Sequence, residues 1–450
     1  MKKSLSLVAV AMVAIASAFS QGSSESGSSS VVQASKLPAS IDVWCINNPN
    51  ESIIKAYDDV GAAFEAKTGV KVNYIRTPTN DFHTKLVTSI SAGVFPDVII
   101  WNSSPGIEFS STGKVVPMDD VVDEIGRGEF SEGTLKMFTV GGKLLEAPFM
   151  VRPAGIHARK DWLEAAGYDT TLKTDANGKY FIEGIQTWDD LIEAGKKITD
   201  ASNGKYGLGF GYSRKAFGDS AGFVFSVYAS YGARIIDEKG NICIDSPEMR
   251  NVIDFLRRMW ESGAVPPAAT TWDGNSNNNY FIGGDIGICL NSNSITGKLN
   301  ATTGCKPEDL VMIPMPKGPK GSYLEASPES ITVFDTKNVA GAKEFAKYLL
   351  RTETQAEMFK TMGFGYYSPL KKSTAADPLF ANLTDNQKVL MQDSLNAVGP
   401  SFPGEPNAKL SALYSAFFFD DILSHIAVDN WTDDQIIADL EKKAKETLFD

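Results

Sequence analysis

Near residue 90 the apolar residues change from helical spacing to a short continuous run, which predicts a helix followed by a strand. Apolar residues recur at helical spacing from 86 to 94, and Gly93 and Pro96 end this segment. The apolar run at 98–100 is short enough to be a buried strand. Residues 101–104 (Trp-Asn-Ser-Ser) then place an aromatic ring and polar groups at the carboxyl end of that strand, where open α/β sheets bind their ligands.

The preceding residues predict the same alternation of elements. The run 41–45 is a candidate strand. Apolar residues on one face of 53–64 predict a helix that ends at Gly69, and 70–75 alternates as a second strand. Together these segments predict a β-α-β-α-β unit, which builds a largely parallel sheet with right-handed crossovers.

Later segments predict a second region that also mixes helices and strands. Thr187 is a candidate helix N-cap, and Asp190, three residues later, is a weak capping-box partner. The other expected elements are a hairpin at 175–184, a helix at 249–263, a helix-turn-strand segment at 277–290, a helix at 340–350, and C-terminal helices at 386–397, 410–428 and 432–449.

The N-terminal residues have the pattern of a secretory signal. Residues 1–3 are basic, 5–16 form an apolar stretch, and 16–18 offer a small-residue cleavage site. The alternative, a retained membrane anchor, is less favoured because the apolar run is short for a bilayer. We therefore expect a signal peptide at 1–18, a flexible Ser/Gly-rich tether at 19–36, and a periplasmic or secreted protein.

Charge and cysteine content narrow the class of protein. The 55 acidic and 43 basic residues give a net charge of -12, which argues against nucleic acid as a partner. The chain has 4 cysteines, too few to define the scaffold; Cys289 and Cys305 are the closest pair, and a disulfide or buried thiols are both open. No cysteine precedes Cys45, so we expect no lipid anchor.

Motifs for catalysis and cofactors are weak in this chain. Residues 218–222 match G-x-S-x-G, but no convincing strand precedes them, and a polar helix start is the favoured interpretation. The 3 histidines have no paired spacing, and 175–178 lacks the later ligands of a calcium loop. We therefore expect no enzyme activity, no metal and no cofactor.

Several segments, taken in order and spacing, resemble the extracellular solute-binding proteins, which are the sugar-binding receptors of ABC importers. The segments that carry the resemblance are 85–104 (around Pro96-Asp97-Val98), 113–119, 155–167, 236–248, 277–290, 331–350 and 365–369. The resemblance extends from about residue 41 to the C-terminus. It implies an α/β fold of the two-lobed, class II-like periplasmic-binding-protein type, with hinge-linked lobes and a ligand cleft between them.

The same resemblance implies a division of the chain into lobes. Lobe 1 is expected at 37–148 with a return segment at about 311–365, and lobe 2 at 149–310. The C-terminal helices, at about 366–450, are expected to pack across both lobes.

Candidate ligand-binding residues lie at predicted strand ends and linkers. Carbohydrates present hydroxyl groups around an apolar ring face, so their sites combine aromatic platforms with amide, carboxylate and guanidinium groups on apolar walls. The candidates are Trp44, Asn48, Asp81, Phe82, Trp101, Ser103, Ser104, Arg152, Trp272, Asn291, Asn293 and Tyr366. Trp101 is the first choice as platform, because maltodextrin-type receptors carry a stacking tryptophan at the corresponding strand end.

Arg152 departs from those receptors, which have a glutamate at about this point. Its guanidinium suits a carboxylate or phosphate on the ligand. It could equally bind neutral hydroxyls or support a neighbouring acid, and a neutral sugar is the favoured ligand.

The resemblance implies that a monomeric receptor captures a carbohydrate, closes about its hinge and delivers the sugar to the permease subunits of an ABC transporter. The alternatives are a receptor for a phosphorylated polyol, a polyamine or a peptide, and a secreted glycoside hydrolase.

Overall fold

The first sheet combines three parallel strands from the N-terminal part with strands that return later in the chain. The computed structural model describes residues 37–48, 50–102, 104–216, 219–363 and 367–449. The sheet has seven strands in the order β16-β7-β15-β3-β1-β2, with β4 also paired to β15. Their bounds are β1 Ser40–Ile46, β2 Lys71–Thr77, β3 Val98–Trp101, β4 Val115–Val116, β7 Ala147–Val151, β15 Glu329–Phe334 and β16 Ser368–Pro369.

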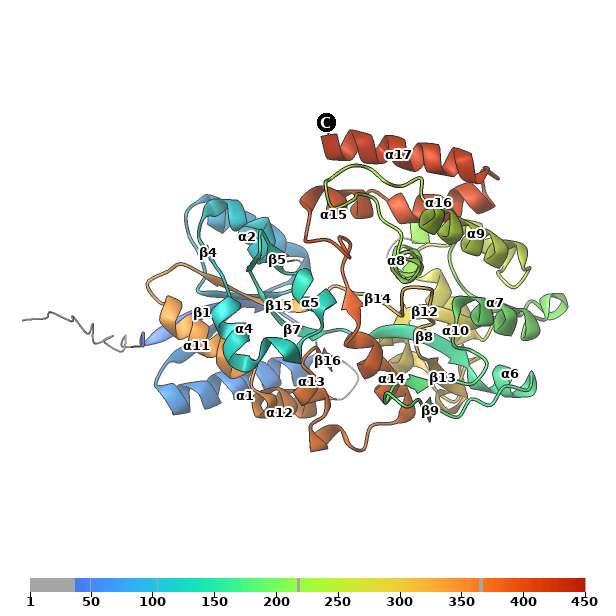
Figure 1. Cartoon of the computed structure of the whole chain (residues 1–450). Helices are drawn as coiled ribbons and strands as arrows, with labels where there is room; N and C mark the ends of the chain where they lie inside the picture. Colours follow the sequence, from blue (N-terminus) through green and yellow to red (C-terminus); the bar gives the residue numbers. More distant parts are fainter. Residues whose placement is uncertain (1–36, 49, 103, 217–218, 364–366, 450) are drawn as a thin grey trace, which may run out of the picture. The chain divides into compact units, whose positions relative to one another are not determined.

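Side-chain alternation gives this sheet two different faces. Val43 and Ile100 belong to the core beneath α1 and α11, whereas Trp44, Ile99 and Trp101 pack with residues of α2 on the other face. Figure 1 shows α1, α4, α11 and α12 around this sheet. α2 therefore covers the face of the sheet that carries the two tryptophans.

The second sheet has four strands in the order β11-β12-β8-β13. Their bounds are β8 Ala154–Arg159, β11 Tyr206–Leu208, β12 Ile286–Ser292 and β13 Leu310–Ile313. β11 and β12 are parallel, and β8 is antiparallel to both β12 and β13. Three strand pairs lie outside both sheets: β5 Thr139–Val140 with β6 Lys143–Leu144, β9 Lys173–Thr174 with β10 Tyr180–Phe181, and β14 Leu324–Glu325 with β17 Ala397–Val398.

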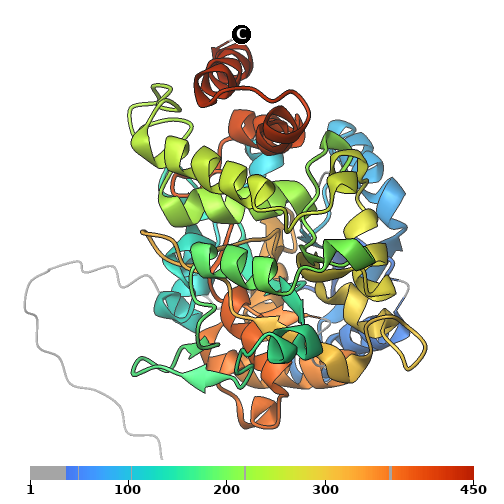
Figure 2. The same cartoon turned by 90° about the vertical axis from the view of Figure 1, so that its right-hand side faces the viewer.

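Helices connect and cover the two sheets. Their bounds are α1 Glu51–Thr68, α2 Thr79–Ser91, α3 Pro105–Glu108, α4 Asp119–Ile125, α5 Glu132–Lys136, α6 Lys160–Ala165, α7 Trp188–Lys197, α8 Asp219–Tyr231, α9 Pro247–Glu261, α10 Ser276–Gly283, α11 Val339–Leu349, α12 Thr352–Met362, α13 Lys372–Ala375, α14 Asp385–Ser394, α15 Ala408–Ser415, α16 Phe418–Ala427 and α17 Asp433–Phe449. α16 packs against α8 and α9, and α17 lies outermost (Figures 1 and 2).

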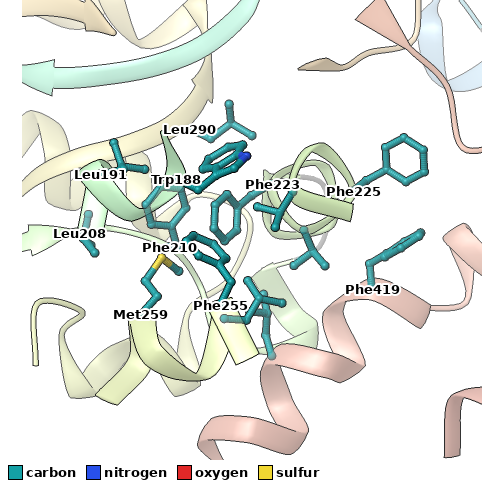
Figure 3. Close-up of a cluster of buried hydrophobic side chains, with 14 of the residues drawn as sticks. Trp188, Leu191, Leu208, Phe210, Phe223, Phe225, Phe255, Met259, Leu290 and Phe419 are labelled. Atoms are coloured by element: carbon teal, nitrogen blue, oxygen red, sulfur yellow. The ribbon is translucent and has the colours of Figure 1, made fainter. Parts of the chain in front are cut away.

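Aromatic rings on α8 contact both the second-sheet side of the core and the C-terminal helices. Phe223 and Phe225 leave α8 on opposite sides (Figure 3). Phe223 packs 4.1 Å from the ring centre of Phe210 and edge-on to Trp188, whereas Phe225 meets Phe419 of α16 edge-on at 5.3 Å. Through these two rings, α8 packs against the second-sheet core on one side and against α16 on the other. Large aromatic side chains bury much apolar surface, so both contacts stabilise the fold.

Most of the predicted elements are confirmed, and the local signals act as expected. Gly69 ends α1 in the left-handed region at φ 75°. Thr187 and Asp190 form a reciprocal capping box at the start of α7. The hairpin predicted at 175–184 is present as β9 and β10, slightly displaced.

Two expectations need correction. The helix predicted at 410–428 is two helices, α15 and α16, because Phe417 adopts the left-handed conformation at φ 65° and interrupts the hydrogen-bond ladder. The first sheet is parallel only for β1, β2 and β3, since β15 runs antiparallel to β3, β4 and β7. The return strand comes from far along the chain, so a local β-α-β pattern does not reveal its direction.

The chain passes between the two sheets at several points. β7 ends at Val151 and β8 begins at Ala154, so the shortest passage is the pair Arg152–Pro153. β14 and β17 pair beside the later passages. The predicted lobe boundaries stay predictions; among them, 148/149 lies inside β7.

Cysteines and hydropathy complete the description. The 4 cysteines are present as thiols, with Cys45, Cys289 and Cys305 buried. Among the helices of the described ranges, none combines the length and apolar character that a bilayer crossing requires.

Candidate ligand site

A pocket of about 650 Å³, open to solvent, lies at the carboxyl end of β3. We call it the edge pocket. Its lining comes from four segments: the turn after β3 and α3 (Asn102, Ser104, Ile107), α5 and the residue after it (Gly133, Lys136, Met137), the residues before β15 (Ala326, Ser327, Pro328), and the β17–α15 connection with the first turn of α15 (Gly399, Pro400, Ser401, Phe402, Gly404, Pro406, Asn407, Ser411). The edge pocket thus occupies the position at which α/β sheets bind ligands.

The lining of the edge pocket combines an aromatic ring with polar groups. Phe402 is half-buried, and the centre of its ring lies 4.8 Å from that of Tyr323. Lys136 supplies a cationic group and pairs with Glu132 one helical turn earlier at 2.8 Å. Such an arrangement suits a ligand with an apolar face and several hydroxyl groups.

The same connection also borders a second hollow. Lys136, Phe402 and Asn407 line both the edge pocket and a hollow of about 1170 Å³ that extends to the 234–240 turn. The two spaces share a wall, so a ligand longer than one ring could follow the surface of this connection.

Sequence reasoning missed Lys136, Phe402 and Asn407. One signal could have identified the last two: Phe402 is the aromatic residue in the segment 399–407, which is rich in glycine and proline and so predicts a surface loop. Lys136 had no such signal, because a lone lysine on a short helix is usually a solvent-exposed residue.

The structure brings three predicted residues together in a buried cluster. Trp44, Phe82 and Trp101 pack with one another on the α2 face of the first sheet, and Trp101 meets Phe82 edge-on at 5.1 Å. Trp101 is only 8% exposed. Lys85 lies 4.6 Å from the centre of the Trp44 ring, whereas Asp81 is exposed in the first turn of α2. The stacking role of Trp101 stays a prediction, because little of its ring is open in this conformation.

Asn48 and Arg152 lie near a buried acid. Asn48 and Glu329 both line a pocket of about 320 Å³ next to the edge of the first sheet. The hydroxyls of Tyr57 and Tyr367 donate to the Glu329 carboxylate, and the Arg152 guanidinium lies 5.9 Å from the centre of the Tyr367 ring.

The electrostatics connect this arginine with the acid. Burial raises the pKa of Glu329, and the Tyr367 hydroxyl and the positive charge of Arg152 oppose that rise. Arg152 therefore has a place beside an acid, which is one of the three roles considered for it.

Three further candidates, Trp272, Asn291 and Asn293, lie at the second sheet, and none of the three lines the edge pocket. Trp272 packs 4.8 Å from Tyr280 and borders a pocket of about 260 Å³ at the ends of β11 and β12; its indole Nε1 has no hydrogen-bond partner among the described residues. The Asn291 amide donates to Asn278, and the Asn293 backbone N–H donates to the Pro153 carbonyl at 3.0 Å.

Two of the predicted residues, Ser103 and Tyr366, lie outside the described residues. Ser104 lines the edge pocket, with a left-handed φ of 49° that non-glycine residues seldom adopt.

The catalytic motif considered for 218–222 has a structural explanation. Ser220 lies in the first turn of α8, is 3% exposed, and its hydroxyl donates to the Gly211 carbonyl at 2.9 Å. This hydroxyl is engaged in the fold rather than presented to a substrate. Among the residues that the structure describes, no three His, Cys, Asp or Glu side chains are grouped to hold a metal ion.

Sequence comparison identifies a family and relatives of this chain. The model of the bacterial extracellular solute-binding protein family matches residues 48–356. A binding protein of Brucella abortus (strain 2308) is 24% identical over 332 residues, which are 73% of this chain and 76% of that protein. The maltotriose-binding protein of Pyrococcus abyssi is 23% identical over 252 residues, 55% of this chain and 48% of that protein.

Solved structures agree in fold. The sugar-binding protein MalE from Xanthomonas citri superposes with a TM-score of 0.74 at 17% identity, over 91% of this chain and 97% of that one. The cyclic alpha-maltosyl-1,6-maltose binding protein from Arthrobacter globiformis superposes with a TM-score of 0.71 at 18% identity, over 91% of this chain and 99% of that one. The expected periplasmic-binding-protein fold is confirmed.

The chain belongs to the family of bacterial extracellular solute-binding proteins. It is a substrate-binding protein of the ABC-transporter type, and its family consists of receptors rather than enzymes.

Proposed function

We propose that this protein captures a carbohydrate, a mono- or oligosaccharide, outside the cytoplasmic membrane for an ABC importer. The maltotriose-binding relative and the two sugar-binding structural neighbours support this ligand class. The predicted signal peptide supports the location.

The observation that carries the proposal is the composition of the edge pocket. Phe402 and Met137 offer apolar surface to a sugar ring, while Asn102, Ser104 and Asn407 offer amide and hydroxyl groups to its substituents. An apolar wall with a small number of polar groups gives a ring both contact area and a fixed orientation.

The proposed mechanism is hinge closure. The ligand binds at the edge of the first sheet, contacts residues around the second sheet, and stabilises the closed state by the difference between its affinities for the two states. The short Arg152–Pro153 passage between β7 and β8 is a place where such a rotation would concentrate. A closed monomer is then the form that the permease subunits are proposed to recognise.

A thermal-shift screen tests the ligand class. The panel holds maltotriose, other mono- and oligosaccharides, sugar alcohols, phosphorylated sugar alcohols, a polyamine and a peptide. We expect stabilisation by one or more neutral sugars, because ligand binding to the folded state raises its melting temperature by mass action.

A Phe402→Ala variant is the control for the site, and it should lose the shift that the best sugar produces. Stabilisation by the phosphorylated compounds, the polyamine or the peptide alone would contradict a neutral carbohydrate as ligand.

A further inference from the structure

Glu146 is a fully buried acid beneath the turn that follows β3. It is 0% exposed and lies in the connection between β6 and β7. Its Oε1 accepts a hydrogen bond from the Ile107 backbone N–H at 3.1 Å, and the Gly106 N–H also contributes. Glu146 is fully buried and does not line the edge pocket, so its connection to the lining of that pocket is this turn.

A hydrogen-bond relay extends from Glu146 to the end of β3. The other carboxyl oxygen, Oε2, is bonded to the Ser330 hydroxyl, and the same hydroxyl lies 3.2 Å from the Trp101 carbonyl oxygen. A hydroxyl has one proton to donate. When Glu146 is a carboxylate, Ser330 donates its one proton to it and the Trp101 carbonyl loses that donor; when Glu146 is protonated, it can donate to Ser330, and Ser330 can then donate to Trp101.

The environment of Glu146 supports the protonated form. Burial raises the pKa of this carboxyl to about 7, against the effect of the hydrogen bonds that it accepts. The groups that hydrogen-bond to it are all neutral: the Ser330 and Thr332 hydroxyls and the backbone N–H groups of Gly106 and Ile107. Three charged residues on neighbouring elements have other partners: Glu108 of α3 pairs with His83 at 2.8 Å, Glu329 of β15 binds Tyr57 and Tyr367, and Asp119 of α4 binds Arg127 and the Leu144 N–H.

The turn after β3 packs tightly against Glu146. A Cβ on Gly106 would lie 2.5 Å from Glu146 Cγ and 2.9 Å from the Leu145 carbonyl oxygen, so a side chain has no room there. Ser104 keeps its left-handed conformation while its carbonyl accepts from the N–H groups of Ile107 and Glu108 at 3.1 Å each. Strained conformations of this kind persist only where the surroundings hold them.

We propose that Glu146 is a positioning residue of the ligand site, which holds the turn after β3 so that Asn102 and Ser104 face the edge pocket. The proposal rests on the proposed function only for the identity of the ligand. When Glu146 loses its proton, the relay to Trp101 loses a donor and a buried charge faces neutral groups, so the turn loosens and ligand affinity falls.

Glu146→Gln imitates the protonated acid, because its amide N–H can donate to Ser330 while its oxygen accepts from Ile107. Glu146→Ala removes the relay. Glu329→Gln is the matched control: the same substitution at the adjacent buried acid, whose side chain lies on the opposite face of β15 from that of Ser330.

Hydrogen exchange of the 101–110 peptide, corrected for intrinsic rates, measures how well the turn is protected in the absence of a ligand. Between about pH 6 and about pH 8.5 we expect its protection to fall about fivefold or more in the unmodified protein and in Glu329→Gln, and to stay constant in Glu146→Gln. Glu146→Ala should be poorly protected at both pH values, while the exchange of α9 peptides stays unchanged.

Titration calorimetry with maltotriose as the probe links the turn to binding. The affinity should follow the same pH pattern in the same variants. An identical pH slope in the unmodified protein and in Glu146→Gln, or full protection in Glu146→Ala, would overturn the proposal. If maltotriose fails to bind the unmodified protein, that result counts against maltotriose as the ligand and not against carbohydrates as a class, and the exchange data still decide the role of Glu146.

Discussion

The carboxyl edge of the first sheet and the strand ends of the second sheet enclose pockets of different size. At the first sheet, a pocket of about 650 Å³ is surrounded by side chains from four segments. At the second sheet, the pocket beside Trp272 is about 260 Å³, and the Asn291 side-chain amide and the Asn293 backbone N–H bond to other parts of the chain.

This difference predicts that the two regions contribute unequally to ligand affinity. Both regions contain polar groups that are already paired, such as Lys136 and Asn407 at the first sheet and Asn291 at the second, but the larger pocket at the first sheet offers a ligand more contact area. We therefore expect the first-sheet edge to supply most of the affinity and the second-sheet region to add contacts on closure.

The largest effect is expected for Trp101→Ala, which tests whether the first-sheet edge depends on its buried aromatic cluster. Removal of a packed tryptophan costs about 3–5 kcal/mol of unfolding free energy. Chemical denaturation measures this loss, and calorimetry on the folded fraction measures sugar affinity. A stable variant with weakened binding would instead support the stacking role predicted for Trp101.

Phe402→Ala should weaken sugar binding by about 2 kcal/mol, roughly 30-fold, because the ring supplies both contact area and stacking geometry. Titration calorimetry measures the affinity. Phe449→Ala, which alters a 64% exposed phenylalanine outside the lining of the edge pocket, is the control and should bind as before. Equal affinities in both variants would remove Phe402 from the site.

Buried acids in both regions should make stability fall as pH rises. Burial raises the pKa of Glu146 from 4.5 to about 7 and that of Asp393, which accepts from the Met315 N–H, from 3.8 to about 8. The unfolded chain loses these protons near the lower values, so unfolding releases protons. The unfolding free energy should therefore decrease from about pH 4.5 to about pH 8, by at most about 1.4 kcal/mol per pH unit for each acid.

His157 acts in the opposite direction at lower pH. Burial lowers its pKa from 6.5 to about 4, so acidification below 6.5 favours the unfolded state, which binds the proton. Denaturation between about pH 6.5 and about pH 8 thus isolates the acids. Glu146→Gln and Asp393→Asn should each flatten the slope there, and an unchanged slope in both would contradict their buried, protonated state.

Arg152→Gln should have a smaller effect on binding. For a neutral sugar we expect an affinity loss below about fivefold, nearly the same at two salt concentrations, since no charge on the ligand is screened. Calorimetry at both ionic strengths checks this. A large, salt-dependent loss would indicate an anionic ligand, and no loss at all would leave Arg152 only the role of supporting Glu329.

The smallest effect is expected for Trp272→Phe, which keeps a ring and removes the indole N–H. A buried donor without a partner costs free energy, so its removal should leave the melting temperature unchanged or slightly higher. Affinity should fall less than in Phe402→Ala. A larger loss than in Phe402→Ala would reverse the ranking of the two regions.

Much of the element order was predictable because its signals are local. The change from helical to strand spacing around residues 86–100, the stop at Gly69 and the cap at Thr187 all depend on residues within a few positions of each other. The break at Phe417 had no such signal, since a phenylalanine gives no local reason to leave the helix.

The candidate site was predictable only where it follows a strand. Asn102 and Ser104 adjoin the end of β3, and the pattern located that position. The pattern did not distinguish an open aromatic ring from a packed one, so it chose Trp101, which is 8% exposed, and passed over Phe402.

The sequence by itself determined the family, the order of helices and strands, and the strand end beside which the edge pocket lies, because each of these is encoded in neighbouring residues. The tertiary structure alone decided which distant segments surround that strand end. Ser330 meets Glu146 across 184 positions and Trp101 across 229, and Phe402 reaches the edge pocket from the far end of the chain. Such contacts arise from the packing of whole elements, so no local pattern of hydrophobic and polar residues contains them.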